Sequence, residues 1–250
     1  MSVDRFGPLA QAYAAYRPRY PEALYDWLAA QCLQRRVAWD CGAGSGQATL
    51  PLSRRFSRVI ATDISQAQLG EAPALDNVAY RVAPAEASGL DAASVDLLAV
   101  AQALHWFDLD RFHAEARRVL VPGGVIAAWT YGVPALEDPA AHAAFRYFHD
   151  HIVGPYWPAE RHKVGEGYLA LPFPFPKLAP PPFRMHDDWT LDTLLGYLRS
   201  WSATGAYVKT HGRNPVDEFT TELVACWGDR ERRIGVDWPL TVIAGRTDSA

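Results

Sequence analysis

Five short and nearly uninterrupted apolar runs mark the first half of the chain. They cover residues 37–41, 58–63, 78–82, 95–100 and 124–130, and helix-like segments separate them. Strands buried on both faces have such continuous apolar runs, and their alternation with helices is typical of a parallel sheet. The pattern therefore predicts an α/β fold with a doubly wound, mostly parallel sheet.

Capping residues place the helices around these strands. Asp108 can cap a helix from Leu109 to Val119, and Pro122-Gly123-Gly124 ends that connection sharply. Beyond residue 183 we expect strands at 183–189 and 238–245 and helices at 191–201 and 216–227.

The stretch from 132 to 182 has a different composition. It is rich in aromatic residues and prolines, and its proline-rich part at 171–182 alternates proline with phenylalanine. This alternation favours a lid that packs on the rest of the protein, while a polyproline ligand for another domain is the alternative. The histidines at 142, 149, 151 and 162 lack metal-ligand spacing, so we predict no metal.

Composition narrows the class of protein. With 250 residues, of which 49% are hydrophobic, the chain can form one large domain with an inserted cap. A net charge of -4 argues against nucleic acid as a partner, and no apolar run is long enough for a membrane span. Three scattered cysteines suit a reducing compartment. We therefore expect a soluble, cytoplasmic protein.

The most informative segment joins the first strand to a glycine-rich turn. It reads Asp40-Cys41-Gly42-Ala43-Gly44-Ser45-Gly46, and the second strand ends at Asp63. Glycines permit close approach of a ligand to the backbone, and a carboxylate at the second strand end can accept hydrogen bonds from a ribose. The G-x-G-x-G spacing differs from the dinucleotide fingerprint and fits a cofactor without a pyrophosphate.

This order of motifs resembles that of the class I S-adenosylmethionine-dependent methyltransferases. Further matches are Glu86 after the third strand, Gln102-Ala103-Leu104-His105-Trp106 after the fourth, and the Pro-Gly-Gly turn before the fifth. The opening Tyr13, Tyr16-Arg17-Pro18-Arg19-Tyr20-Pro21 is similar to that of small-molecule enzymes of this family related to trans-aconitate methyltransferase.

The resemblance implies a seven-stranded sheet whose last strand runs antiparallel between the fifth and sixth. It implies one methyltransferase domain over 1–250, with an N-terminal helical lid at 1–30 and a cap insertion at 132–182. The cofactor would be S-adenosylmethionine, with S-adenosylhomocysteine as product. The residues expected to bind it are Arg17, Asp40, Gly42, Gly44, Asp63, Ala85, Glu86, Ala101 and Gln102.

A small-molecule acceptor would lie against a second set of residues. These are Tyr13, Tyr20, His105, Trp106 and Tyr131. His105 can act as a general base or as a positioning group, and Arg17 can pair with a carboxylate of the cofactor or of the acceptor. No other catalytic residue is assigned, and the oligomeric state stays open.

The sequence therefore predicts methyl transfer to a small acceptor at oxygen, either a carboxylate or a hydroxyl. One alternative is a non-catalytic binding module that keeps the cofactor fold. A nicotinamide-dependent oxidoreductase is disfavoured by the glycine spacing and by the absence of a Tyr-x-x-x-Lys pair in the central region.

Overall fold

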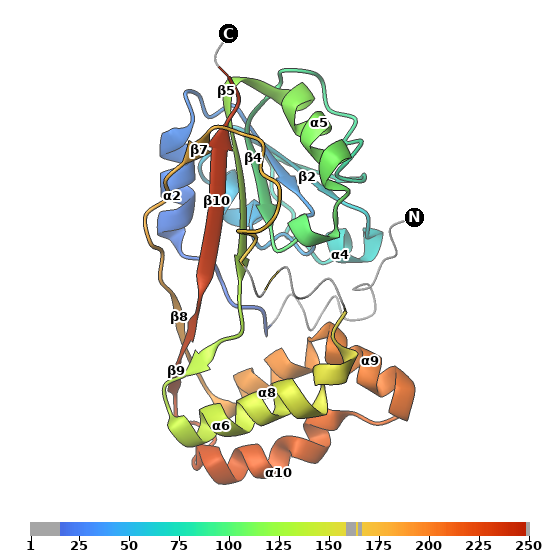
Figure 1. The fold of residues 1–250 in the computed structure, drawn as a ribbon, viewed down its shortest axis with the longest axis vertical. Helices are drawn as coiled ribbons and strands as arrows, with labels where there is room; N and C mark the ends of the chain where they lie inside the picture. Colours follow the sequence, from blue (N-terminus) through green and yellow to red (C-terminus); the bar gives the residue numbers. More distant parts are fainter. Residues whose placement is uncertain (1–15, 159–163, 165–166, 249–250) are drawn as a thin grey trace.

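The computed structural model describes residues 16–158, 164 and 167–248, which form a seven-stranded sheet above a layer of helices (Figure 1). The sheet has the strand order β3-β2-β1-β4-β5-β10-β7. Its strands are β1 (Val37–Cys41), β2 (Arg58–Asp63), β3 (Val78–Val82), β4 (Val95–Ala101), β5 (Leu120–Tyr131), β7 (Lys177–Leu178) and β10 (Leu240–Arg246).

The strand directions match the predicted fold. The first five strands are parallel, whereas β10 runs antiparallel to both of its neighbours, β5 and β7. The prediction of a mostly parallel sheet with an antiparallel last strand is therefore confirmed. The sixth-strand position is held by β7, which has only two residues.

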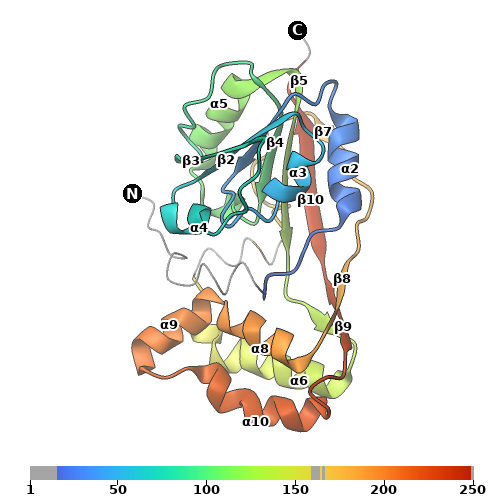
Figure 2. The same ribbon diagram turned by 180° about the vertical axis from the view of Figure 1, so that it is seen from behind.

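Helices cover both faces of this sheet. Helices α2 (Glu22–Gln31) and α3 (Thr49–Ser53) lie on one face and α5 (Leu109–Val119) on the other (Figure 2). Helix α2 buries Leu24, Tyr25 and Leu28 completely. Each such side chain contributes about 1.5–3 kcal/mol through the apolar surface that it removes from water. As predicted, Asp108 caps α5, because its side chain accepts the N–H of Arg111.

A second, three-stranded sheet of β6 (Ala135–Leu136), β9 (Ile234–Trp238) and β8 (Met185–Trp189) leads into the helical layer. The helices there are α6 (Pro139–Tyr147), α8 (Leu191–Arg199), α9 (Ser202–His211) and α10 (Pro215–Trp227), with the short η3 (Phe148–Ile152) and η4 (Gly154–Tyr156). The helical layer therefore includes residues beyond 182, the end of the predicted cap insertion.

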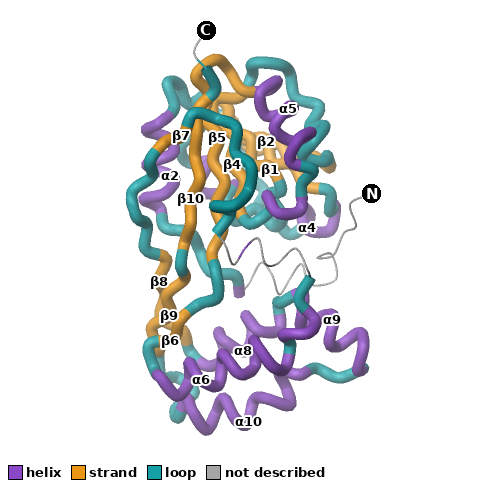
Figure 3. Tube along the Cα trace, viewed as in Figure 1, coloured by secondary structure: helices purple, strands orange, loops and turns teal. Residues whose placement is uncertain are grey.

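Several predicted elements differ from the structure in their bounds, such as β5, which begins at Leu120 and not at Gly124, and two further differences have a local physical cause. The expected strand at 238–245 is divided at Pro239, so β9 pairs in the small sheet and β10 in the large one (Figure 3). Proline has no N–H for the strand ladder, which explains the break. The expected helix at 191–201 ends at Arg199, because Trp201 is extended and starts α9.

The proline-rich stretch at 171–182, expected to pack as a lid, lies against the large sheet. Phe173 and Phe175 join the core cluster on the α5 face. Arg117 of α5 donates to the carbonyl of Pro174 at 2.7 Å, and β7 pairs with β10. The phenylalanines cover apolar sheet surface that α5 leaves open, which is the physical reason for this position. None of the described helices is long and apolar enough to cross a bilayer.

Candidate functional site

The parallel strands β1, β2, β4 and β5 all end at the edge of the sheet that faces the helical layer (Figures 1 and 2). The chain proceeds outward from β1 to β2 and β3 and then returns to β4 on the other side of β1. In open α/β sheets, ligands bind beyond the carboxyl ends of the strands at this reversal of order. The predicted site residues follow these strand ends.

The glycine turn after β1 has the conformation that its sequence predicts. Gly42, Gly44 and Gly46 have φ angles of 72°, 55° and 82°, in the left-handed region that glycine adopts readily. A Cβ atom on Gly42 would lie 2.5 Å from the Cβ of Ala103, beyond the end of β4. Gly42 is therefore required both by the backbone conformation and by the close packing of the two strand ends.

Asp63 ties the glycine turn to the end of β2. Its Oδ2 accepts the N–H of Gly44 at 2.9 Å, and its Oδ1 accepts the N–H of Ser65 at the same distance. A carboxylate offers about four lone pairs, so it can accept further hydrogen bonds from hydroxyl groups. Asp63 thus has a structural task that the motif did not reveal, in addition to the ribose contact expected of it.

Asp40 is the fully buried carboxyl group at the start of the turn. Its Oδ2 accepts the hydroxyl of Thr49 at 2.6 Å, and burial raises its pKa to about 7. The other oxygen, Oδ1, has no hydrogen-bond partner among the described residues. The same holds there for two more buried oxygens beside the turn, Ser45 Oγ and Gln68 Oε1.

These three oxygens lie around a single turn, since a Cβ built on Gly44 would come within 3.1 Å of Gln68 Oε1. Buried polar atoms in native proteins are normally paired, and an unpaired one costs about 1–3 kcal/mol. The cluster therefore fits a ligand that brings hydrogen-bond donors, such as an ammonium and hydroxyl groups. The predicted cofactor carries such donors, in the ammonium group of its methionine part and the hydroxyl groups of its ribose.

The predicted adenine-side residues lie beyond β3. Ala85 is buried, and Glu86 Oε1 accepts the N–H of Asp108 at 2.9 Å. Glu86 therefore also secures the start of α5. Its contact with an adenine stays a prediction.

Gln102, after β4, has a positive φ of 55° and turns its side chain to β5. Its Oε1 accepts the hydroxyl of Thr130 at 2.6 Å, and its Nε2 donates to the carbonyl of Tyr131 at 3.2 Å. Both ends of the amide are thus engaged. The Gln102 side chain therefore joins the ends of β4 and β5. Ala101 and Gln102 would contact the cofactor through their backbone atoms.

Arg17, Tyr20 and Tyr131, which the sequence predicted for the site, do come together. Arg17 Nη1 donates to Tyr131 Oη at 3.1 Å, and the Tyr20 ring lies 6.0 Å from that of Tyr131. The Arg17 guanidinium also lies 5.7 Å from the ring of Tyr197 on α8. No sequence signal marked Tyr197, because it is one of several large buried side chains of α8. Tyr13, also predicted, lies outside the described residues.

His105 and Trp106 form the short helix η2 (Leu104–Trp106) after β4, with ring centroids 4.6 Å apart. His105 is buried, and its Nδ1 lies 2.8 Å from the hydroxyl of Tyr168. In the sequence analysis, Tyr168 is only one of many aromatic residues of the predicted cap. The contact joins residues 63 positions apart, which no local pattern could have predicted.

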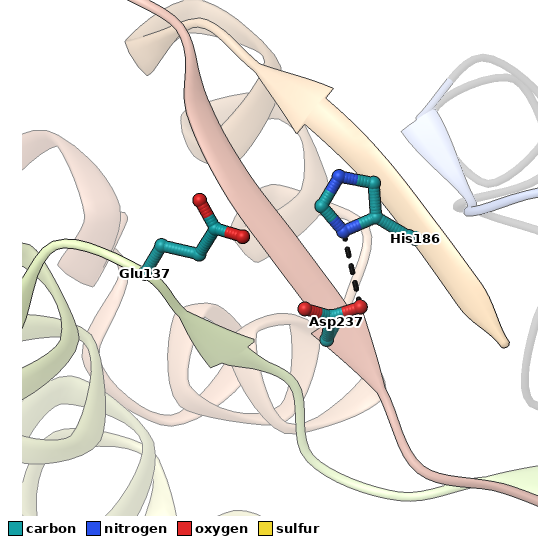
Figure 4. A group of neighbouring side chains, drawn as sticks. All are labelled: Glu137, His186 and Asp237. Atoms are coloured by element: carbon teal, nitrogen blue, oxygen red, sulfur yellow. Dashed lines mark hydrogen bonds and ion pairs between the residues drawn. The ribbon is translucent and has the colours of Figure 1, made fainter.

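The small sheet brings together another group of polar side chains, Glu137, His186 and Asp237 (Figure 4). Their potential metal-ligating atoms lie within 4.8 Å of one another. However, Arg184 donates to both oxygens of Asp237, at 3.0 and 3.3 Å, and lies 3.1 Å from His186 Nδ1. The protein thus supplies a positive charge of its own there, and we assign an ion-pair cluster.

Comparison with known proteins agrees with the geometry. The family described as "Methyltransferase domain" matches residues 39–128. A Dictyostelium discoideum protein named as a methyltransferase is 32% identical over 98% of this chain and 95% of its own. A solved structure from Anaeromyxobacter dehalogenans, described as a type II methyltransferase, is 47% identical and covers 94% of this chain and 100% of its own, with a TM-score of 0.85. A malonyl-[acyl-carrier protein] O-methyltransferase of Methylovorus is 29% identical over 85% of this chain and 74% of its own.

Proposed function

This chain belongs to the class I S-adenosylmethionine-dependent methyltransferases, and we propose that it transfers the methyl group to an oxygen of a small-molecule acceptor. The observation that carries the cofactor assignment is the set of unpaired buried oxygens around the glycine turn. The narrower similarity to trans-aconitate methyltransferase stays a prediction from the N-terminal motif.

The cofactor supplies an electrophilic methyl group on a sulfonium. The residues that would hold it are those at the strand ends. Asp40 and the turn oxygens would face the methionine ammonium, Asp63 the ribose, and Ala85 with Glu86 the adenine. Gly42 and Gly44 would allow close approach of the backbone.

Methyl transfer is an in-line displacement, so the chain must position the acceptor and exclude water. A covalent intermediate on the protein is not needed. Cys41, the thiol in the turn, is fully buried, and burial raises its pKa well above the ordinary range. It therefore stays a packed thiol and not a nucleophile.

A carboxylate is the acceptor that the site residues favour. Arg17 and the hydroxyl of Tyr131 offer a cation and a donor beside the aromatic rings of Tyr20 and Trp129. A carboxylate is ionised at neutral pH and needs no general base. The relative named as an O-methyltransferase of malonyl-acyl carrier protein supports an oxygen acceptor.

Cofactor binding is tested first by calorimetric titration with S-adenosylmethionine, S-adenosylhomocysteine and NAD. We expect the first two to bind and NAD not to bind. Asp63→Asn should weaken the first two at least tenfold, since a charge-assisted hydrogen bond contributes about 1.5–3 kcal/mol. Asp76→Asn, at an exposed carboxylate, is the matched control. Binding of NAD alone would refute the proposal.

Turnover is tested by S-adenosylhomocysteine release with a panel of carboxylic acids and phenols. A methyl ester releases methanol in mild base, whereas a methyl ether does not, so base treatment of the product identifies the acceptor oxygen. Cofactor binding without turnover on any acceptor would favour the non-catalytic binding module.

The same two assays distinguish two possible roles of Arg17, in binding the cofactor or in binding the acceptor. If Arg17 holds the carboxylate of the cofactor, Arg17→Ala raises the Kd of S-adenosylmethionine at least tenfold. If it holds the acceptor, the acceptor KM rises instead and the Kd is unchanged. Arg17→Lys keeps the charge but loses the planar fork, and should recover only part of either loss.

A further inference from the structure

Tyr168 lies within hydrogen-bond distance of His105, and we propose that it positions His105 for the acceptor. In this assignment, Tyr168 donates its hydroxyl hydrogen to His105 Nδ1, which leaves the proton of the neutral imidazole on Nε2. His105 then acts as a hydrogen-bond donor to an acceptor oxygen and not as a general base. The inference rests on the proposed transfer to oxygen and names the residue that sets the chemistry of His105.

The contact between the two side chains is close and shielded from water. Tyr168 Oη lies 2.8 Å from His105 Nδ1, and the two ring centroids are 5.8 Å apart. Tyr168 is 1% exposed and His105 8% exposed. A hydrogen bond is stronger in such a low-dielectric setting than in water.

The backbone that presents Tyr168 adopts a conformation that a bulky side chain rarely takes. Its φ is 64°, directly after Gly167 with a φ of 67°. A Cβ on Gly167 would lie 2.6 Å from Thr241 Oγ1 on β10, so this turn is pressed against the large sheet. Left-handed conformations of bulky residues persist where the surrounding structure enforces them and are concentrated at functional sites.

The direction of the hydrogen bond follows from the groups involved. A phenol is a good donor, and buried tyrosine hydroxyls normally find an acceptor. A neutral imidazole has one acceptor nitrogen, and the hydrogen bond at that nitrogen fixes the tautomer. Donation from Tyr168 to Nδ1 therefore places the proton on Nε2. An N–H donor suits an ionised carboxylate, which has no proton to give up.

The first experiment reads the tautomer of His105 directly, by two-bond ¹H–¹⁵N correlation of the imidazole in the wild-type protein. Assignment comes from the spectrum of His105→Gln. We expect the neutral ring to carry its proton on Nε2, and Tyr168→Phe to yield a mixture of tautomers. A proton on Nδ1 in the wild type would overturn the inference without any measurement of activity.

The second experiment measures kinetics with Tyr168→Phe, which keeps the ring and its packing. We expect the acceptor KM to rise about 3- to 10-fold, as loss of one hydrogen bond predicts, while kcat and the Kd of S-adenosylmethionine stay unchanged. An unchanged acceptor KM would overturn the inference. Tyr147→Phe removes a phenol from a half-exposed position on α6 and is the matched control.

The two failures are distinguishable. If no acceptor is turned over by the wild type, the proposed function fails and the acceptor role of His105 fails with it. If turnover is normal but Tyr168→Phe leaves the KM and the tautomer unchanged, only the inference fails. Should Tyr168→Phe not fold, the tautomer of the wild type still decides the direction of the hydrogen bond.

Discussion

Replacement of Asp40 by asparagine should make the protein more stable at alkaline pH while weakening its cofactor binding. Burial raises the pKa of Asp40 from 3.8 to about 7. Between these two pH values the folded state keeps a proton that the unfolded state has lost, so stability falls as pH rises through this window. At about 1.4 kcal/mol per pH unit, ionisation of Asp40 lowers the free energy of unfolding by about 4 kcal/mol by pH 8.

Asp40→Asn removes this titration while keeping the shape of the group and an oxygen for the hydroxyl of Thr49. The free energy of unfolding is measured by urea titration at pH 5, 6, 7 and 8 without cofactor. We expect the stability of the variant relative to wild type to rise by about 1.4 kcal/mol per unit up to pH 7 and then to level off. Asp76→Asn, at an exposed position, should follow the wild-type curve at every pH.

Parallel curves for wild type and Asp40→Asn would refute the reasoning, because they would mean that Asp40 is already ionised in the folded protein at pH 5. The same samples test function. If the unpaired Oδ1 of Asp40 receives the methionine ammonium, the Kd of S-adenosylmethionine at pH 8 should rise at least tenfold in the variant.

Three other substitutions test the physical account elsewhere. Gly42→Ala forces a side chain into the left-handed region and against the chain beyond β4, so we expect a loss of about 2 kcal/mol in urea unfolding and no measurable cofactor binding. Gly235→Ala displaces only the flexible carboxylate of Glu137, and its cost should stay below about 1 kcal/mol. Hydrogen bonds from Arg118 lower the pKa of Glu115 to about 2. The ionised Glu115 therefore stabilises the fold above pH 4.5, and this stability is lost as the pH falls toward 2. Glu115→Gln should therefore cost about 2 kcal/mol at pH 7, and the difference from wild type should shrink below pH 4.5.

The sheet and the glycine turn could be predicted because their signals are local. Parallel strands bury both faces and so appear as unbroken apolar runs, and all five runs coincide with strands. The left-handed turn needs glycine at fixed places, which the spacing of Gly42, Gly44 and Gly46 displays directly.

The division of the strands between two sheets could not be predicted from such local signals. The predicted strand at 238–245 overlaps the end of β9 and most of β10, and the missing N–H of Pro239 separates these two strands. Whether a proline lies at a strand edge or at a break depends on its neighbours in space. Likewise, α9 begins because the backbone of Trp201 is extended, and Trp201 is buried among aromatic rings of α6, η3 and α8.

Candidate site residues could be predicted where a sequence motif carries them, but not where a long-range contact carries them. Arg17, Asp63 and His105 belong to sequence motifs. Tyr168 and Tyr197 enter only through contacts with His105 and Arg17, across 63 and 180 positions of the chain. A single sequence does not show which of its many aromatic residues makes such a contact.

Violations of ordinary folding rules gather at the edge of the sheet where the strands end. Of the three non-glycine residues with positive φ in the described structure, Gln102 and Tyr168 contact the strand ends or η2, while Ala93 lies at the opposite end of β4. The desolvated carboxyl of Asp40 lies at the same edge, beside oxygens left unpaired. Each of these features reduces stability, and packing of the large sheet compensates for the loss. A ligand that satisfies the unpaired oxygens should therefore stabilise this protein beyond what its contact area alone predicts. The rise in Tm with S-adenosylmethionine should fall sharply in Asp40→Asn, because one of those oxygens then no longer carries a charge.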